Sequence, residues 1–165
     1  MKVIYLFTVK GCFIVLLLLS FSCKPKVVSE LTDQERNKIS KEIETVVDNF
    51  VDPNLNSEKH IALRADKDGY IYAGDGKILF TDYESYKGGV KSSFDNIQKF
   101  IELKSIKTCV YVLSIDAASC TTEFQGKYIN TSGDTIVHNG CWTFVFKKFN
   151  NEWKVIQENG THTKE

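Results

Sequence analysis

Several features that would define a class of protein are missing from this sequence. The 165 residues contain no internal repeat, no low-complexity tract and no cluster of basic residues. The 21 basic and 21 acidic side chains give a formal net charge of zero, which argues against a nucleic-acid-binding protein. What is present is ordinary for a globular chain, with 42% hydrophobic and 25% charged residues. The length suffices for one domain with a substantial core.

The N-terminal segment has to be set aside before the fold is considered. Residues 1–22 carry Lys2 and Lys10 in their first half, continue with an apolar run over 12–19, and end with two serines around Phe21 just before Cys23. This order is typical of a signal peptide, and the apolar run is too short for a comfortable membrane span. Small residues before Cys23 resemble a bacterial lipobox, which implies that Cys23 is lipidated and becomes the first mature residue. A plain signal peptide or an uncleaved anchor is the alternative.

The chain therefore divides into a signal peptide at 1–22, a short tether at 23–30 and one domain at 31–165. Cleavage removes two of the 21 basic residues and no acid, so 19 basic residues face 21 acidic ones and the mature net charge is about −2. We expect a lipid-anchored protein of the bacterial cell envelope, on the periplasmic or outer-membrane side.

Helices are predicted in the first half of the domain. Thr32 and Glu35 form a capping-box pattern, and apolar residues then recur at helical spacing as far as Phe50. A shorter helix is predicted over 56–64. The stretch "GYIYAGDGKILF", residues 69–80, predicts two short strands around a Gly-Asp-Gly turn.

A long helix is predicted next. "TDYE" reads as a second capping box, Thr81 with Glu84, and an apolar stripe with spacings of three and four follows as far as Ile101. From there the pattern changes to alternation, which predicts four long strands over 107–115, 119–128, 135–149 and 153–161.

Turn positions fix the expected register of these strands. A two-residue loop at 150–151 places Phe146 opposite Val155 and Trp142 opposite Asn159. A loop at 116–117, with a bulge at 139–140, extends the same face across the sheet. The helix-covered face is then expected to carry Cys109, Tyr111, Leu113, Thr122, Phe124, Trp142, Phe144, Phe146, Trp153, Val155, Gln157 and Asn159.

The opposite face is expected to be mixed, with acids such as Glu123 and Glu158 beside aliphatic residues. Val110, Val112, Val145 and Ile156 form an apolar patch there that a solvated face does not need. We therefore expect a homodimer contact through this outer sheet face.

The order of elements resembles a known family. Helices come first, then a hairpin containing "YAGDGK" (72–77), a long helix, and an antiparallel meander ending in "WTFVFKKFNNEWKV" (142–155) and "NGTH" (159–162). This pattern is similar to the nuclear transport factor 2-like superfamily, which includes SnoaL-like and ketosteroid isomerase-like domains. The resemblance covers the chain from about Leu31 to its end. It implies an α+β fold in which helices pack on a curved antiparallel sheet to form a cone.

Enzymes of this superfamily carry an acid or a histidine inside the cone as the proton-transferring group. The expected inner face has no Asp, Glu or His on its four long strands, which lowers the prospect of catalysis. Glu123, if the register slipped by one residue, or Asp48 from the first helix would have to serve instead. No catalytic residue is assigned.

Candidate ligand-binding residues are the aromatic and amide side chains expected to line the cone. An aromatic wall with two amides suits an apolar ligand that carries one polar group. Half-buried packing and a core indole satisfied by a neighbouring amide are the alternatives. The candidates are Tyr70, Tyr72, Tyr111, Trp142, Gln157 and Asn159.

Cysteine and histidine offer neither a disulfide nor a metal site. Cys109, Cys120 and Cys141 have no C-x-x-C spacing, and the register separates them, so we expect three free thiols. His138 and His162 fall on adjacent strands and could approach each other, but a third ligand is lacking. No metal and no cofactor are expected.

Three functions stay open from the sequence. The leading hypothesis is a lipid-anchored, non-enzymatic module that binds a small apolar molecule or a protein partner. The second is an isomerase, cyclase or dehydratase acting on a small apolar substrate, which needs a buried carboxylate with a raised pKa. The third is a purely structural dimer.

Overall fold

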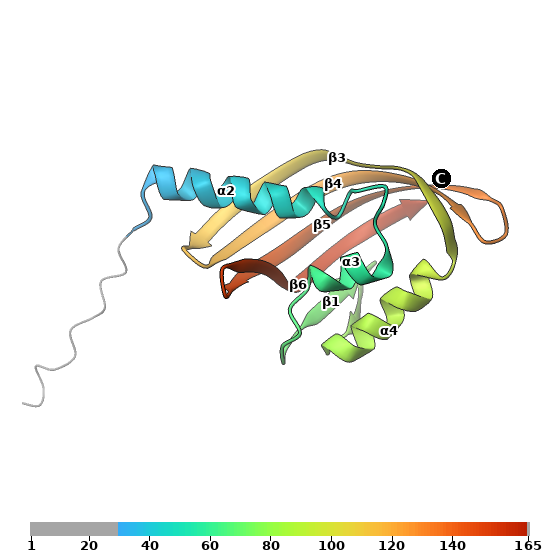
Figure 1. Ribbon diagram of the computed structural model, residues 1–165, viewed down its shortest axis with the longest axis horizontal. Coiled ribbons are helices and arrows are strands. Elements are labelled where there is room, and N and C mark those ends of the chain that lie inside the picture. Colours follow the sequence, from blue (N-terminus) through green and yellow to red (C-terminus); the bar gives the residue numbers. More distant parts are fainter. Residues whose placement is uncertain (1–29, 165) are drawn as a thin grey trace, which may run out of the picture. The chain divides into compact units, whose positions relative to one another are not determined.

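The computed structural model describes residues 30–164, and residues 31–165 form one compact unit. Three helices precede and interrupt a sheet of six strands (Figure 1). Within the described residues, no helix is long and apolar enough to cross a membrane. The elements are α2 (Asp33–Asp48), α3 (Ser57–Ala62), β1 (Ile71–Gly74), β2 (Lys77–Phe80), α4 (Tyr83–Phe94), β3 (Ile97–Ser114), β4 (Ala117–Asn130), β5 (Thr135–Phe149) and β6 (Glu152–Lys164).

The first two helices begin where the sequence predicts. Thr32 accepts from the Glu35 backbone N–H, and the Glu35 carboxylate accepts from the Thr32 N–H at 2.8 Å, which completes the capping box. Asn56 caps α3 through its side chain, which accepts from Lys59 N–H. Cys23, which is expected to be lipidated, and the expected tether as far as residue 29 lie outside the described residues, so both stay predictions.

The long helix is shorter than predicted. Its N-cap is Asp82, which accepts from Ser85 N–H at 2.8 Å, so the expected Thr81 cap is wrong. The helix ends at Phe94, and β3 already begins at Ile97. The spacing that suggested helix beyond this point arises in a bulged strand, where the two-residue alternation is broken.

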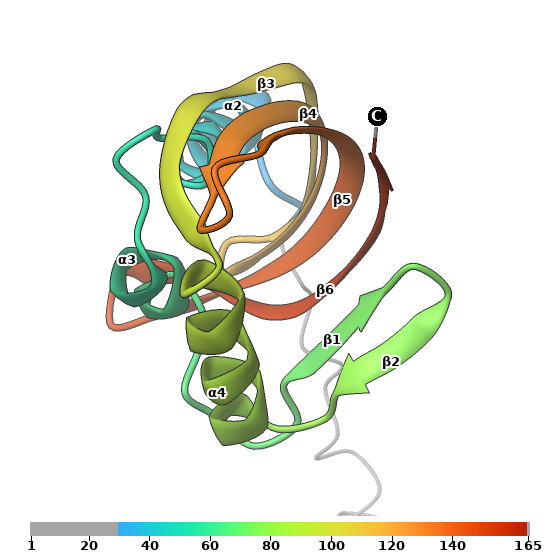
Figure 2. The ribbon, with the colours of Figure 1, turned by 90° about the vertical axis from the view of Figure 1, so that its right-hand side faces the viewer.

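The six strands form a mixed sheet in the order β2-β1-β6-β5-β4-β3. All neighbours are antiparallel except β1 and β6, which run parallel. Figure 2 shows how strongly β3 to β6 curve, with α3 and α4 near one end of the curl. We call the concave face, which carries Trp142, Phe144 and Phe146, the inner face.

Bulges on the edge strand β3 account for much of the curvature. Its pairing with β4 shifts at four places, and each shift leaves one residue of β3 without a direct partner. Ile101, Ile106 and Leu113 are three of these residues, and all three side chains are exposed. A regular two-residue alternation assigns the side chains of β3 to the two faces of the sheet without these extra residues. The sequence pattern alone therefore assigns the residues of this strand to the wrong faces.

The faces of β3 are the reverse of the expected ones. The β3–β4 turn lies at 115–116, one residue earlier than expected, and Leu113 adds a bulge, so Val112 pairs with Ala118. Val112 is therefore buried on the inner face, whereas Tyr111 is 70% exposed. Cys109 and Leu113 also lie outside the core, contrary to expectation.

This reversal weakens the proposed dimer contact. Val112 is buried and Val110 packs against the core, so neither contributes to an outer patch. A homodimer through the outer sheet face stays a prediction, which now depends on Val145 and Ile156. The position of β4 was predicted better, because Phe124 and Thr122 do face inward, although Thr122 rather than Phe124 lies opposite Trp142.

The terminal hairpin begins as predicted and then departs from the expected register. Asn150 and Asn151 both have positive φ, as a two-residue hairpin turn requires, and Phe146 pairs with Val155. A bulge then adds one residue to β6, so Val145 pairs with Gln157. Every later side chain of β6 changes face.

Trp142 consequently lies opposite Gly160 and not Asn159. Gln157 and Asn159 are exposed, whereas Glu158 is 1% exposed. The expectation of an inner face without an acid is therefore wrong, and the sheet carries a carboxylate into the core.

Candidate functional site

A buried ion pair lies against the inner face. The Arg64 guanidinium donates to both oxygens of the Glu158 carboxylate, from Nε at 2.9 Å and from Nη2 at 2.8 Å. Both side chains are almost fully buried, at 2% and 1% exposure. Tyr70 donates its hydroxyl to the same carboxylate in a short hydrogen bond. Glu158 therefore accepts three hydrogen bonds, two of them from the Arg64 cation.

The surroundings of Arg64 are aromatic. Its guanidinium lies 4.4 Å from the centroid of the Phe50 ring, and its Nη1 donates to the His60 carbonyl at 2.8 Å. Burial opposes the charge, but the Glu158 carboxylate outweighs it and raises the pKa of Arg64 above its ordinary value. Burial together with the Glu158 charge raises the pKa of Tyr70, so this hydroxyl stays protonated and acts as a donor.

His60 and Tyr86 continue this network from the two short helices. The Tyr86 hydroxyl and His60 Nδ1 are 3.0 Å apart. Burial, followed by the positive charge of Arg64, lowers the pKa of His60 well below 6.5. His60 is therefore neutral near pH 7, and burial raises the pKa of Tyr86 so that it stays neutral as well.

Aromatic rings form a closed circuit around the inner face. Each ring contacts the next at centroid distances between 5.0 and 6.3 Å, and the last ring returns to the first. Such distances are typical of interacting aromatic pairs. In order, the nine residues are Tyr72, Tyr86, His60, Phe94, Phe100, Tyr128, His138, His162 and Trp142.

Most of this aromatic circuit is only partly buried. Trp142 and Tyr86 are buried, whereas the other seven residues of the circuit keep intermediate exposure. Three of these seven, Phe94, Phe100 and Tyr128, lie where α4 passes into β3 and where β4 approaches the β4–β5 turn. We call this part of the circuit the open end of the cone.

Glycines on neighbouring strands allow two rings of the aromatic circuit to pack directly against the sheet. A Cβ on Gly160 would stand 2.6 Å from Trp142 Cδ2, and one on Gly126 would stand 2.3 Å from His138 Cε1. Both distances are far below normal contact, so at each position the ring occupies the space that a Cβ atom would need, and only glycine fits without a shift. The glycine positions thus contribute directly to the shape of the inner face.

His162 connects the aromatic circuit to the β1–β2 turn. Its Nε2 accepts from the Trp142 indole N–H at 3.2 Å, and its Nδ1 lies 3.5 Å from Asp75 Oδ2. Asp75 also accepts from the His162 backbone N–H at 2.7 Å. The carboxylate beside Nδ1 favours the tautomer in which Nε2 is the acceptor.

Three hydroxyl groups form a further polar cluster on the inner face. Ser105, Thr108 and Thr122 lie within 2.8–3.1 Å of one another through their side-chain oxygens. Thr122 is 2% exposed and also donates to the Lys107 carbonyl. The cluster is adjacent to Phe124, because Ser105 pairs with Phe124 across β3 and β4.

The structure brings together only half of the predicted ligand-binding residues. Tyr72 and Trp142 are in direct contact at 5.0 Å, and Tyr70 is part of the buried network. Tyr111 lies on the outer face, as do Gln157 and Asn159 beyond the bulge in β6, so these three do not line the cone.

Sequence reasoning missed Arg64, Glu158 and His60 as inner-face residues. Glu123 is exposed on the outer side, as predicted, and Asp48 is exposed on α2. His138 and His162 do approach each other, with ring centroids 6.1 Å apart. In the described part of the chain, no group of three or more His, Cys, Asp or Glu side chains is placed to hold a metal ion.

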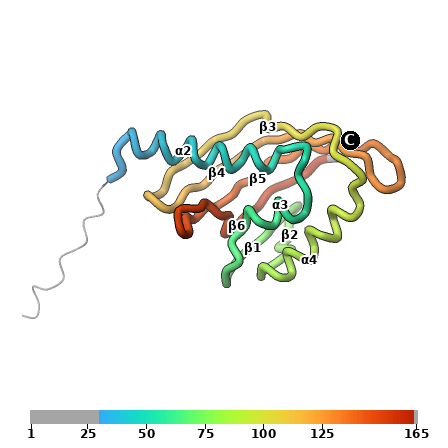
Figure 3. Tube along the Cα trace, in the orientation of Figure 1, coloured from blue at the N-terminus to red at the C-terminus, as the bar shows by residue number. Residues whose placement is uncertain are grey.

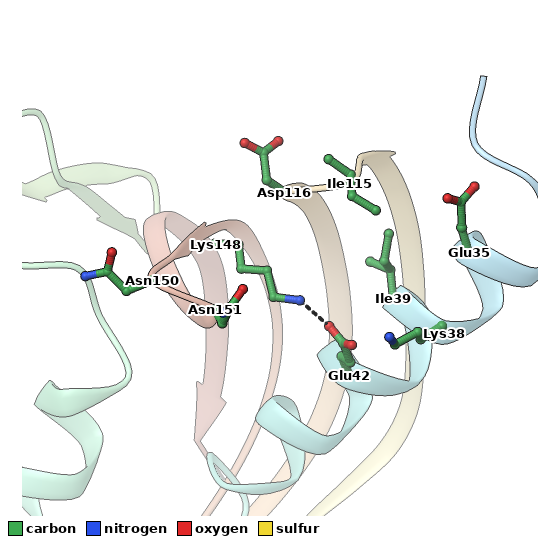
Figure 4. Close-up of a pocket in the computed structure, with 9 residues that line it drawn as sticks. All are labelled: Glu35, Lys38, Ile39, Glu42, Ile115, Asp116, Lys148, Asn150 and Asn151. Carbon is green, nitrogen blue, oxygen red and sulfur yellow. Dashed lines mark hydrogen bonds and ion pairs between the residues drawn. The ribbon is translucent and has the colours of Figure 1, made fainter. Parts of the chain in front are cut away.

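Two surface pockets follow α2, away from the aromatic circuit. The first, of about 520 Å³, is lined by side chains of the first turns of α2, by the β3–β4 turn with Ile115, and by the β5–β6 turn with Asn151 (Figure 4). The second, of about 580 Å³, continues past Trp153. Glu42 stands between them, accepting from Lys148 Nζ and from the Trp153 indole, each at 2.7 Å.

Comparison with known proteins depends on structure alone, because no protein-family model and no curated protein sequence matches the chain. A putative scytalone dehydratase from Novosphingobium aromaticivorans superposes with a TM-score of 0.69 at 14% identity, covering 80% of this chain and 89% of that one. The chain has the nuclear transport factor 2-like fold.

Two further structures support this fold. A nuclear transport factor 2-like superfamily protein from Salmonella enterica gives a TM-score of 0.67 at 12% identity, covering 76% of this chain and 91% of that one. A hexachlorocyclohexane dehydrochlorinase gives 0.65 at 11% identity, covering 81% and 93%. The predicted α+β cone is thereby confirmed. Because proteins with this fold include enzymes, the function has to be argued from the site.

Proposed function

We propose that this nuclear transport factor 2-like chain is a lipid-anchored, non-enzymatic binding protein of the bacterial envelope. Its ligand is a small, flat, apolar molecule that carries a polar group. The observation that carries this proposal is the closed circuit of nine aromatic rings, seven of which belong to residues that are only partly buried. Exposed aromatic surface on a concave face is the feature that apolar ligands bind.

The hydrogen bonds of the inner face favour binding over catalysis. The Glu158 carboxylate is held by Arg64 and Tyr70, so it is not free to accept a proton from a substrate. His60 is engaged by Tyr86, and His162 uses its Nε2 lone pair for the Trp142 indole. A general base needs an accessible lone pair within hydrogen-bonding reach of its substrate.

Calorimetric titration with 2-naphthol, which is flat, apolar and has one hydroxyl group, tests the binding proposal. Phe124→Ala should weaken binding at least about tenfold, because the Phe124 ring contacts both His138 and His162 of the aromatic circuit, at centroid distances of 5.7 and 6.0 Å. Tyr111→Ala on the outer face is the matched control and should leave binding unchanged. Equal losses in both variants, or no binding to wild type, would contradict the proposal.

Lipid anchoring is supported by the lipobox-like segment before Cys23. Cys23→Ala should release the protein into the soluble fraction. The wild-type mass should include acyl groups that the variant lacks. Identical fractionation of the two proteins, without acyl mass, would refute the anchor.

An elimination or isomerisation enzyme is the second candidate, and the His162–Asp75 pair is the observation that favours it. If the Trp142 indole released Nε2, His162 could accept a proton from carbon while Asp75 supported the imidazolium. Solvent deuterium would then enter small cyclic ketones incubated with the protein, as followed by NMR. The exchange should disappear in His162→Asn and persist in Glu123→Gln.

A further inference from the structure

Three exposed apolar side chains gather at the turn between β3 and β4. Tyr111, Leu113 and Ile115 are 70%, 55% and 59% exposed and lie within five residues of one another. Leu113 is a bulged residue, and Ile115 is in the turn itself. Isolated apolar residues are normal on a surface, but a group at one protruding turn marks a contact surface. We call these three residues the β3–β4 tip.

The tip lies at the end of the domain where the described chain begins. Ile115 lines the same pocket as Glu35 and Ile39 from the first two turns of α2. Arg36, also in the first turns of α2, donates to the Val112 carbonyl at 3.3 Å. Figure 3 shows the start of α2 and the β3–β4 turn at the same end of the unit.

The length of chain before Leu31 limits how far this end can lie from a lipid on Cys23. Eight Cα–Cα steps separate Cys23 from Leu31, and at 3.3–3.6 Å per residue they span roughly 26–29 Å at most. A bilayer that holds Cys23 therefore stays within roughly 26–29 Å of Leu31, just before the start of α2. The β4–β5 turn, at the other end of β4, is farther from the start of α2 by the length of that strand.

We propose that the β3–β4 tip docks on the lipid surface to which Cys23 is anchored, with Leu113 and Ile115 entering the interfacial layer. Tyr111 suits the headgroup level, because its ring is apolar and its hydroxyl is polar. The inference depends on the lipid anchor of the proposed function. Three side chains do not hold a free domain on a membrane, so the tip acts only while the tether keeps it close.

Apolar contact, and not charge, drives this docking. Two lysines beside the tip are paired within the protein, since Lys147 pairs with Asp116 at 2.6 Å and Lys148 pairs with Glu42 at 2.7 Å. Replacing zwitterionic by anionic lipid should therefore change the contact little. A second copy of the chain is a less favoured occupant, because it would have no reason to select the end of the domain that carries the tether.

The test supplies the anchor chemically, so it does not depend on acylation in the cell. Residues 24–165 contain the whole compact unit, and an N-terminal hexahistidine tag attaches them to vesicles containing a nickel-chelating lipid. Cys109 and Cys141 are changed to Ser, and an environment-sensitive dye is placed on Ile115→Cys. Ser132→Cys, in the β4–β5 turn at the opposite end of the strand, is the matched control.

Brominated phosphatidylcholine should quench the dye at position 115 at least about twofold and leave the dye at 132 unchanged. Adding Leu113→Asp and Tyr111→Ser should abolish the quenching at 115 while the protein stays attached. Equal quenching at both positions, or none at 115, overturns the inference. A dye signal at 115 that depends on protein concentration without vesicles would assign the tip to self-association and would also overturn it. Failure of the natural anchor is read separately, from the fractionation of Cys23→Ala.

Discussion

Arg64 and Glu158 lie 94 positions apart in the sequence and meet on the inner face through two hydrogen bonds of 2.8 and 2.9 Å. Neither charge reaches solvent, so each depends on the other. The pair joins the end of α3 to the last strand, and Tyr70 connects it to the start of β1. The ion pair thus links segments that share no other buried charge among the described residues.

Glu158→Gln should lower the free energy of unfolding by roughly 3–5 kcal/mol, because it leaves the buried Arg64 charge without its counterion. Urea denaturation measures the loss. Glu152→Gln is the control, since Glu152 pairs with Lys154 at the surface with 71% of its side chain exposed, and should change stability by less than about 1 kcal/mol. The double variant Arg64→Met with Glu158→Leu should recover much of the stability. A small effect of Glu158→Gln alone would show that the pair is not structural.

Local sequence signals predicted the parts of the fold that depend on local chemistry. Thr32 and Glu35 form the expected capping box, and two asparagines take the positive φ of the terminal hairpin. The pairing of Phe146 with Val155 follows from that turn. Each of these features is decided within a few residues, so the sequence pattern contains the necessary information.

Bulges explain most of the site that could not be predicted. One extra residue in β6 moves Glu158 to the inner face and removes Gln157 and Asn159 from it. The bulge bends β6 and shifts its register by one residue, and no local turn signal in the sequence marks it. Arg64 was missed for a related reason, since its role depends on a carboxylate that only the bulge brings inward.

Stability should decrease at low pH because of His60. Its pKa in the folded protein is depressed well below 6.5 by burial and by Arg64, whereas in the unfolded chain it is near 6.5. The unfolded state therefore binds the proton first as the pH falls, and stability is lost below about pH 6.5 with a slope of at most roughly 1.4 kcal/mol per pH unit. His60→Asn keeps a polar partner for Tyr86 and should remove this part of the slope. Denaturation at pH 7.5, 6 and 5 compares the two proteins, and parallel curves would contradict the prediction.

The three cysteines of the domain are free thiols in the structure, as the sequence predicted, but their accessibilities differ. Cys109 and Cys141 are exposed, whereas Cys120 is 1% exposed and burial raises its pKa to about 12. A thiol reagent at pH 8 should modify two cysteines quickly in the folded domain and the third only after unfolding. Mass analysis of digested protein identifies the slow residue. Fast modification of Cys120 would show that β4 opens readily.

Two glycine substitutions should change stability in opposite directions. A Cβ on Gly160 would stand 2.5 Å from the Cys141 carbonyl oxygen and 2.6 Å from Trp142 Cδ2, so Gly160→Ala forces strand and indole apart. We expect a loss of roughly 1–3 kcal/mol and an altered Trp142 emission spectrum. Gly88 lies within α4 with nothing within 4 Å of the added atom, so Gly88→Ala should gain about 0.5–1 kcal/mol from the better helix propensity of alanine. Urea denaturation of both variants beside wild type gives the comparison. A neutral Gly160→Ala would mean that Trp142 does not lie flat on β6, and the aromatic circuit would then be open at that point.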